Sequence, residues 1–232
     1  MNQKKNLNAL FVGENTDANS AAMTLAENIE QFLLAEKTAG EYAAFVRNIF
    51  KETIAAPADD PVWKLLDYLE SDTDFYTAPA STRFHGSKKH GLVMHSLLVL
   101  AKGIKFAPTM LAGNVEIYFL TLSCLFHDFC KIGMYEIKVR NSKNEKTGSW
   151  EDVQFYKVKE EYLSFGHGVE SMLRLNKYIA MPEPWNHAIR WHMGAYDLSY
   201  LDKFSYEKAL ATYKEVLFLH TADMQAGLID GV

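Results

Sequence analysis

The sequence predicts a mainly α-helical domain with one inserted β-hairpin. In several segments, such as 115–125, apolar residues recur at intervals of three and four, which is the period of an amphipathic helix. The segments 135–139 and 153–159 instead alternate in the manner of strands, and the polar stretch 141–150 between them predicts a hairpin turn. A chain of 232 residues is long enough for one such domain, with at most a small appendage.

The N-terminal quarter predicts an arm followed by packing helices. The apolar run 9–12 is too short for the hydrophobic region of a signal peptide. We therefore expect residues 1–19 to form a loose arm. Two packing helices should fill 20–60, the first ending at Gly40 and the second covering 43–54. Pro61 then suits the first turn of a further helix.

We expect the remainder, 61–232, to form the main helical domain. Its polar, turn-rich segment 71–90 should run over a site and not through the core. The hairpin should occupy about 134–160. Apolar periodicity predicts the other helices at 91–104, 115–128, 168–179, 183–193 and 205–226.

Composition excludes several classes of protein. The 48% of apolar and 23% of charged residues are ordinary for a globular protein. The net charge of −5 makes binding of long nucleic acid unfavourable. The two cysteines form no CxxC pair, which excludes a disulfide framework and a Cys-rich zinc module and favours reduced thiols in the cytoplasm. No stretch approaches the roughly 18 consecutive apolar residues of a membrane span, so we expect no membrane partner.

The most informative short motif is the pair His127–Asp128 at the end of an apolar helix. A helix C-terminus carries partial negative charge and favours a bound cation. An imidazole nitrogen beside a carboxylate suits Mn, Fe, Co, Ni or Zn better than Ca. Taken alone, such a pair more often consists of two capping residues, so the interpretation needs support from elsewhere in the chain.

Four further residues have suitable chemistry. His95 points along the apolar face of its helix, and Asp223 shares the apolar face of the last helix, where a carboxylate needs a cation or hydrogen bonds. His167 lies between two glycines at a helix start, where small neighbours allow a ligand to approach closely. His192 is in the last turn of its helix. Each residue taken singly has a structural alternative, such as a hydrogen-bonded core histidine.

In combination, His95, His127, Asp128 and Asp223 resemble the H…HD…D signature of the HD-domain superfamily of metal-dependent phosphohydrolases. The resemblance covers about 81–226. The sequence HDFCK resembles the HD-x-x-K version of the motif, and the polar loop with the GL-x-x-H-S helix that follows is similar to phage- and plasmid-associated HD proteins.

This resemblance implies an HD-type helical bundle that binds one or two divalent ions, namely Fe, Mn, Co, Ni or Zn, with Mg also compatible. The four signature residues would hold one ion, and Asp128 would bridge to a second ion on His167 and His192. Asp128 and Lys131 are the expected catalytic residues, with Lys131 neutralising the charge that develops on phosphate. The implied activity is hydrolysis of a phosphate ester, of a nucleotide in the first instance, by metal-activated hydroxide.

A local positive cluster predicts where the phosphate group binds. Arg83, His85 and His90 lie together in an otherwise acidic chain, whereas we expect the lysines between them to be solvated. Arg190 is a further phosphate-binding candidate, because it lies in the same helix end as His192.

Two other functions stay open at this point. A pair of metal ions favours diesters somewhat, so the protein could be a phosphodiesterase or nuclease on cyclic or short oligonucleotides. It could also be a non-catalytic module that binds a metal or a nucleotide, since a fold does not by itself prove a function.

Overall fold

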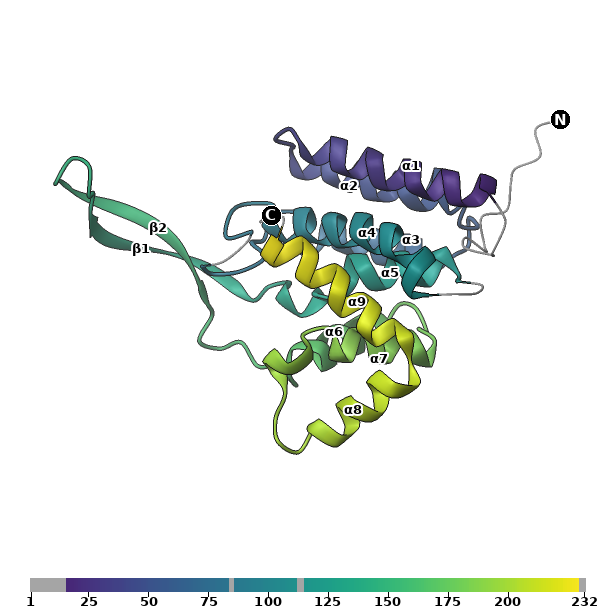
Figure 1. Cartoon of the computed structure of the whole chain (residues 1–232). Coiled ribbons are helices and arrows are strands. Elements are labelled where there is room, and N and C mark those ends of the chain that lie inside the picture. Colours follow the sequence, from purple (N-terminus) through teal and green to yellow (C-terminus); the bar gives the residue numbers. More distant parts are fainter. Residues whose placement is uncertain (1–15, 84–85, 112–114, 230–232) are drawn as a thin grey trace.

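The structure, a computed structural model, describes residues 16–83, 86–111 and 115–229. Over these residues the chain forms nine α-helices and a single antiparallel hairpin, so the predicted fold class is confirmed (Figure 1). The strands are β1 (Tyr135–Lys143) and β2 (Trp150–Val158). The helices are α1 (Thr16–Leu33), α2 (Ala39–Asn48), α3 (Val62–Ser71), α4 (Gly91–Met110), α5 (Ile117–Phe126), α6 (His167–Asn176), α7 (Glu183–Trp191), α8 (Lys203–Thr212) and α9 (Lys214–Met224).

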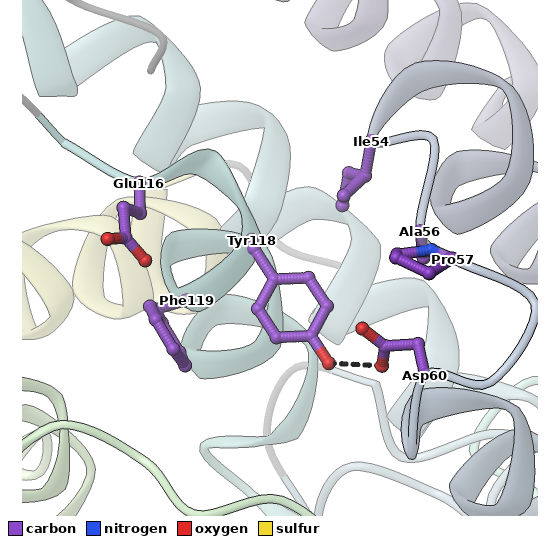
Figure 2. A pocket seen from close by; sticks show the side chains of 7 residues that line it. All are labelled: Ile54, Ala56, Pro57, Asp60, Glu116, Tyr118 and Phe119. Atoms are coloured by element: carbon purple, nitrogen blue, oxygen red, sulfur yellow. Dashed lines mark hydrogen bonds between the residues drawn. The ribbon is translucent and has the colours of Figure 1, made fainter. Parts of the chain in front are cut away.

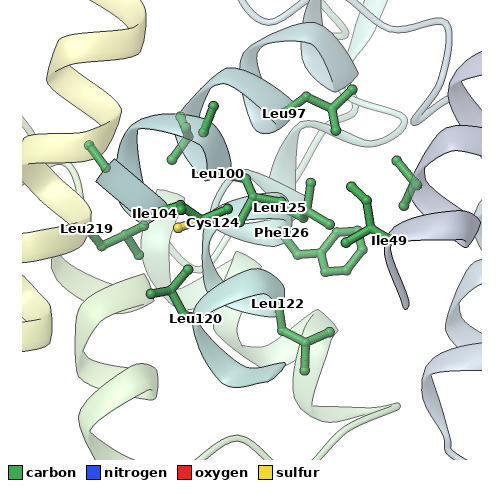
Figure 3. Close-up of a cluster of buried hydrophobic side chains, with 14 of the residues drawn as sticks. Ile49, Leu97, Leu100, Ile104, Leu120, Leu122, Cys124, Leu125, Phe126 and Leu219 are labelled. Atoms are coloured by element: carbon green, nitrogen blue, oxygen red, sulfur yellow. The ribbon is translucent and has the colours of Figure 1, made fainter. Parts of the chain in front are cut away.

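The helices pack in layers around α4. This helix contacts α1 on one side and both α5 and α9 on the other, while α7 contacts α9, α6 and α5 (Figure 1). The main apolar core includes side chains from α1 to α7 and from α9, whereas Ala209 of α8 lies in a small second cluster with Trp191 and Val216. Leu100 and Ile104 of α4 lie in this core with Leu122 of α5 (Figure 3). Gly103 allows the two helices to approach, because a Cβ there would lie 2.8 Å from the Cys124 Sγ.

Helix α4 meets the length and mean hydropathy of a membrane-spanning helix, which its sequence pattern did not lead us to expect. However, 72% of its apolar 18-residue stretch is buried within the protein, as in a core helix. It also continues beyond the predicted end at 104 to Met110, with Pro108 inside its last turn. A proline that close to the end of a helix interrupts little of what remains.

The expected end of the first helix at Gly40 is wrong. Helix α1 ends at Leu33 and Gly40 lies in the first turn of α2. Thr38 caps α2: its hydroxyl accepts a hydrogen bond from the Glu41 amide, and the Glu41 carboxylate accepts one from the Thr38 amide at 2.8 Å. This capping box outweighs the weak helix-breaking effect of a glycine in a first turn. Of the arm expected at 1–19, residues 1–15 lie outside the described residues, and α1 already begins at Thr16.

The long C-terminal helix expected at 205–226 is also wrong, because Tyr213 interrupts it with an extended backbone (φ −122°, ψ 108°). Helix α8 buries only Ala209 of its ten residues, whereas α9 packs against α4 and α7. The Tyr213 ring stacks on His187 of α7 at 5.0 Å between centroids. The break thus lets α9 turn into the core while α8 remains on the surface.

The strands of the hairpin are longer together than the alternating segments 135–139 and 153–159, because they extend into the polar stretch between them. Its register runs from Tyr135 opposite Val158 to Lys143 opposite Trp150, and it projects away from the helices (Figure 1). Gly148, in the turn, has a positive φ of 73°, which glycine adopts without strain. The projecting strands keep apolar side chains such as Ile137, Val139 and Trp150 exposed. At its base, the hairpin connects to α5 through the short turn Phe129–Lys131.

Candidate metal centre

Four signature residues from three different helices and one turn converge in the core. His95 lies in the second turn of α4, His127 caps the C-terminus of α5, Asp128 follows it, and Asp223 lies in the last turn of α9. The His95 Nε2 lies 2.9 Å from the Asp223 Oδ1 and 3.3 Å from the His127 Nε2. The His127 Nε2 lies 3.5 Å from the same Asp223 oxygen. We call this set, completed by the Asp128 Oδ2, the inner donor group.

The spacing within the inner donor group fits a single ion. The Asp128 Oδ2 lies 3.4 Å from the His127 Nε2 and 3.7 Å from the His95 Nε2. Two ligands about 2.1 Å from one metal ion lie roughly 3.0 to 3.4 Å apart, depending on whether the coordination is octahedral or tetrahedral. Two imidazoles and two carboxylates are a donor set that suits a divalent transition metal.

The other oxygen of Asp128 faces a second set of donors, which we call the outer donor group. The Asp128 Oδ1 lies 2.6 Å from the His167 Nε2 and 3.5 Å from the His192 Nε2. The His192 Nε2 is buried and has no hydrogen-bond partner among the described residues. A buried nitrogen of this kind is costly unless something binds it, so His192 also fits a metal ligand.

The tautomers of two histidines are set by the backbone. The Nδ1–H of His127 donates to the Cys124 carbonyl at 2.9 Å, and that of His192 donates to the Ile189 carbonyl at 2.7 Å. Because a carbonyl oxygen can only accept, each Nδ1 carries a proton, and the Nε2 is the nitrogen that remains for a metal ion. Both rings thus present the nitrogen that a metal ion needs.

Charges in the centre compensate one another. Burial disfavours ionised Asp128, yet Lys131 and His127 hold the pKa of its carboxyl well below the usual range. Burial likewise opposes protonation of His127 and His167, but the nearby carboxylate of Asp128 raises the pKa of each to about 10. The protonated imidazoles of His127 and His167 thus balance the negative charge of the carboxylates. A metal ion that binds the same ring nitrogens would displace their protons.

Lys131 lies beside the bridging carboxylate. Its Nζ is 2.6 Å from the Asp128 Oδ2, and Asp128 raises the pKa of this lysine despite its burial. The side chain is 12% exposed, so the ammonium group stands at the edge of the centre. Since an ammonium has three donor hydrogens, Lys131 can bind Asp128 and still donate to a second anion.

The turn that carries Asp128 is tied firmly to α6. Arg174 pairs with Glu170 at 2.6 Å and donates to the carbonyls of Phe129 and Ile132 at 3.3 and 3.0 Å. These bonds satisfy backbone groups that follow the end of α5. They also hold the short 3₁₀ turn 129–131 against the helix that begins with His167.

Gly168 brings the two outer histidines together. A Cβ at this position would lie 2.1 Å from the Arg190 carbonyl oxygen, which is far closer than atoms allow. The start of α6 therefore packs directly on the end of α7, and the rings of His167 and His192 lie 5.2 Å apart between centroids. The FGHG sequence predicted close approach of a ligand, but this glycine permits close approach of another helix.

The predicted phosphate-binding residues are scattered. Arg83 is exposed in the loop before α4, and His85 lies outside the described residues. His90 is buried, and its Nδ1 donates to the Tyr76 carbonyl at 2.5 Å. The Arg190 guanidinium lies 3.9 Å from the Trp191 ring centroid and 3.6 Å from the Asp202 carboxylate. None of these recorded contacts joins Arg190 or His90 to the donor groups, and their phosphate roles stay predictions.

Other residues matter at the centre although the sequence did not point to them. Cys130 contacts His167 through its sulfur, and its amide donates to the Ser171 hydroxyl at 3.1 Å. His220, three residues before Asp223, donates its Nδ1–H to the His192 carbonyl at 2.6 Å. His220 therefore supports the end of α7, which is a structural role. The sequence offered one signal for Ser171: it lies one helical turn after His167 and so on the same face of the helix.

A separate cleft of about 310 Å³ lies between the loop before α3 and the start of α5. Ile54, Pro57 and Phe119 line it, and the Tyr118 hydroxyl donates to the Asp60 carboxylate at 2.6 Å within it (Figure 2). None of the donor residues of the metal centre lines this cleft.

Comparison of the chain with protein-family models, with curated proteins and with solved structures finds no match in any of the three. The description of this protein therefore rests on its own fold and site. This is a mainly helical protein with a buried cluster of histidine and aspartate side chains that can hold a metal ion.

Proposed function

We propose that this protein is a metal-dependent phosphohydrolase of the HD type that acts on a phosphate ester of a nucleotide. One observation carries the proposal: one oxygen of Asp128 faces His95 and His127 and the other faces His167 and His192, with Lys131 beside them. The four signature positions and the two additional histidines all contribute to these sets. Fe, Mn, Co, Ni and Zn suit the nitrogen and oxygen donors.

The residues of the chain have distinct parts in this proposal. A divalent ion held here would supply Lewis-acid activation of water and of a phosphoryl oxygen. His95, His127 and Asp223 would hold the ion in the core, and Asp128 joins the inner and outer donor groups. Lys131 donates to Asp128 and, with its remaining hydrogens, to a phosphate oxygen whose charge grows during the reaction.

The burial of the donors indicates where substrate enters. His95, His127 and His192 are fully buried, whereas His167 is 20% exposed and Lys131 is 12% exposed. A phosphate group can therefore approach on the side of His167 and Lys131. In the inner donor group His95 and His127 are fully buried, and Asp223 is 14% exposed.

The test combines elemental analysis with a hydrolysis screen. We expect protein purified without chelator to contain a divalent transition metal and to hydrolyse at least one phosphate ester of a nucleotide. Asp128→Ala should lose both the metal and the activity, by about 1000-fold or more, because it removes the shared ligand. Asp152→Ala, which changes an exposed carboxylate on the hairpin, is the matched control. Full activity of Asp128→Ala in the presence of chelator would contradict the proposal.

A phosphodiesterase is the second candidate, and the two-sided arrangement around Asp128 supports it. Two ions can stabilise both the attacking and the leaving oxygen of a diester. The screen should therefore include nucleoside monophosphates, triphosphates, cyclic dinucleotides and short single strands. Hydrolysis of oligomers alone would replace the small-nucleotide proposal, and stable metal and nucleotide binding without turnover would indicate a binding module.

A further inference from the structure

The hydroxyl of Tyr135 is held by a long hydrogen bond only, as far as the described residues show. Tyr135 is the first residue of β1 and is half-buried. Its hydroxyl donates to the Ala80 carbonyl at 3.4 Å, whereas about 2.7 to 2.8 Å is usual between two oxygens. This weak bond leaves the hydroxyl available to a better acceptor. Tyr135 has no part in the hydrolysis described above.

A tight turn brings Tyr135 back beside Lys131. The Met134 amide donates to the Lys131 carbonyl at 3.2 Å, and Gly133 has a positive φ of 70°. The residue before Gly133 has φ −62° and ψ 126°, which completes the geometry of a type II turn. The Gly133 amide also donates to the Asp74 carboxylate at 2.8 Å, so the turn is bound to the polar segment that precedes α4.

The contact with Ala80 places the Tyr135 hydroxyl near the start of α4. Ala80 packs on the first residue of this helix, since a Cβ on Gly91 would lie 3.0 Å from the Ala80 amide nitrogen. Gly91 precedes His95 by one helical turn, and residues four apart lie on the same face of a helix. The hydroxyl therefore lies between this face of α4 and the turn that begins at Lys131, on the side where a phosphate group can approach.

The charges of the centre act on this hydroxyl. Burial raises the pKa of Tyr135 to about 12, while the Lys131 ammonium lowers it and the Asp128 carboxylate raises it. At neutral pH the hydroxyl is therefore protonated and can donate. Lys131 also has donor hydrogens beyond the one that binds Asp128. Two donors, one charged and one neutral, thus stand at the same side of the centre.

We propose that Tyr135 is a substrate-binding residue: its hydroxyl donates to a non-bridging oxygen of the phosphoryl group that Lys131 also binds. The inference rests on the proposed phosphohydrolase function and assigns a second donor to the same group. A hydrogen bond to a charged phosphoryl oxygen is shorter and stronger than the long bond to Ala80 that it replaces. Loss of the hydroxyl should therefore weaken phosphate binding and leave the metal ligands as they are.

The experiment compares Tyr135→Phe with the wild-type protein, both loaded with Mn²⁺, in a calorimetric titration with inorganic phosphate. Phenylalanine keeps the ring and removes only the hydroxyl, so the Mn²⁺ content from elemental analysis should equal that of the wild type. We expect the dissociation constant for phosphate to rise by about 10-fold or more. The kcat/KM for the ester that the hydrolysis screen identifies should fall by a similar factor.

Tyr118→Phe is the matched control. Tyr118 is also half-buried, and its hydroxyl donates to Asp60 in the separate cleft, which none of the metal-donor residues lines. This variant also loses a tyrosine hydrogen bond, but it should bind phosphate as the wild type does. If Tyr135 served only to hold Ala80, Tyr135→Phe would lower the melting temperature and leave the phosphate affinity unchanged, which would overturn the proposal.

The outcomes separate the two proposals. Unchanged phosphate affinity and unchanged kcat/KM in Tyr135→Phe, with an active wild type, would overturn the role of Tyr135 alone. Loss of Mn²⁺ from Tyr135→Phe would likewise overturn it, because the hydroxyl would then act on the metal ligands and not on the substrate. A wild-type protein that binds no phosphate and hydrolyses no ester of the screen would overturn both.

Discussion

The inner and outer donor groups share Asp128 but are built in different ways. The inner group takes its side chains from the second turn of α4 and the ends of α5 and α9, which pack directly on one another in the core. The outer group takes His167 from the first residue of a helix that follows a loop, and this residue is 20% exposed.

Because of this difference, we expect the inner donor group to be rigid and the outer donor group to be more mobile. The inner donors cannot move without disturbing the core, so we expect that half to hold its ion tightly and to contribute to stability. The outer half is positioned by Gly168 and Arg174, which are neighbours and not ligands. We expect it to exchange its ion more easily and to meet the substrate.

The largest expected effect comes from Asp223→Ala, which removes an inner ligand. The affinity for the inner ion should fall by more than about 100-fold, because even an indirect partner of a ligand costs up to that much. Hydrolysis should be lost with it. Metal titration and activity assays measure both, and a variant that keeps the tight ion would show that the inner group does not hold it.

His167→Ala should separate the two halves. We expect this variant to keep the inner ion and the melting temperature of the wild type, and to lose the second ion and most of its hydrolysis. His187→Ala is the control, because His187 stacks on Tyr213 away from the donors. Equal loss of both ions in His167→Ala would mean that the halves are one cooperative site.

Removal of metal should destabilise the protein through the inner half. A ligand present at about 100 times its dissociation constant stabilises a folded protein by about 2.7 kcal/mol. We therefore expect chelator to lower the melting temperature of the wild type but to have little effect on Asp223→Ala. A wild-type melting temperature that does not respond to chelator would contradict a stabilising inner ion.

Gly168→Ala tests the packing that brings the outer histidines together. The added Cβ would meet the Arg190 carbonyl oxygen at 2.1 Å, so the helices must shift, at a cost of about 1 to 3 kcal/mol. The outer ion should weaken and the inner ion should persist. Gly40→Ala is the control, since nothing lies within 4 Å of a Cβ there. Unchanged stability of Gly168→Ala would show that the two helices are not held this closely in solution.

The smallest effect is expected on the hairpin, which lies outside both halves. Val139 is 58% exposed, and Val139→Thr should change the free energy of unfolding by less than about 0.5 kcal/mol. Denaturant unfolding and metal titration should both match the wild type. A loss of more than about 1 kcal/mol would indicate that another surface covers this strand.

Much of the fold and of the inner group could be predicted from the sequence. The periods of three and four and the one alternating pair predicted the helices and the hairpin, because each reflects which face of an element is buried. His95 and Asp223 stood out because a titratable side chain on an apolar face needs a partner in the core. The ends of α1 and the break at Tyr213 were missed, since they depend on a cap and on packing against other helices.

The sequence by itself indicated which chemical groups the chain offers: its histidines and aspartates were recognisable as candidate metal donors, and Lys131 as a candidate phosphate-facing cation. The tertiary structure alone decided that the two oxygens of Asp128 face different donors, that the Cys130 sulfur contacts the His167 ring, and that the Arg190 guanidinium contacts Trp191 and Asp202. Periodicity describes the faces of single helices, whereas these contacts depend on how closely separate helices pack. That distance is set by residues such as Gly168 and Gly103, whose missing side chains leave no signal of chemistry in the sequence.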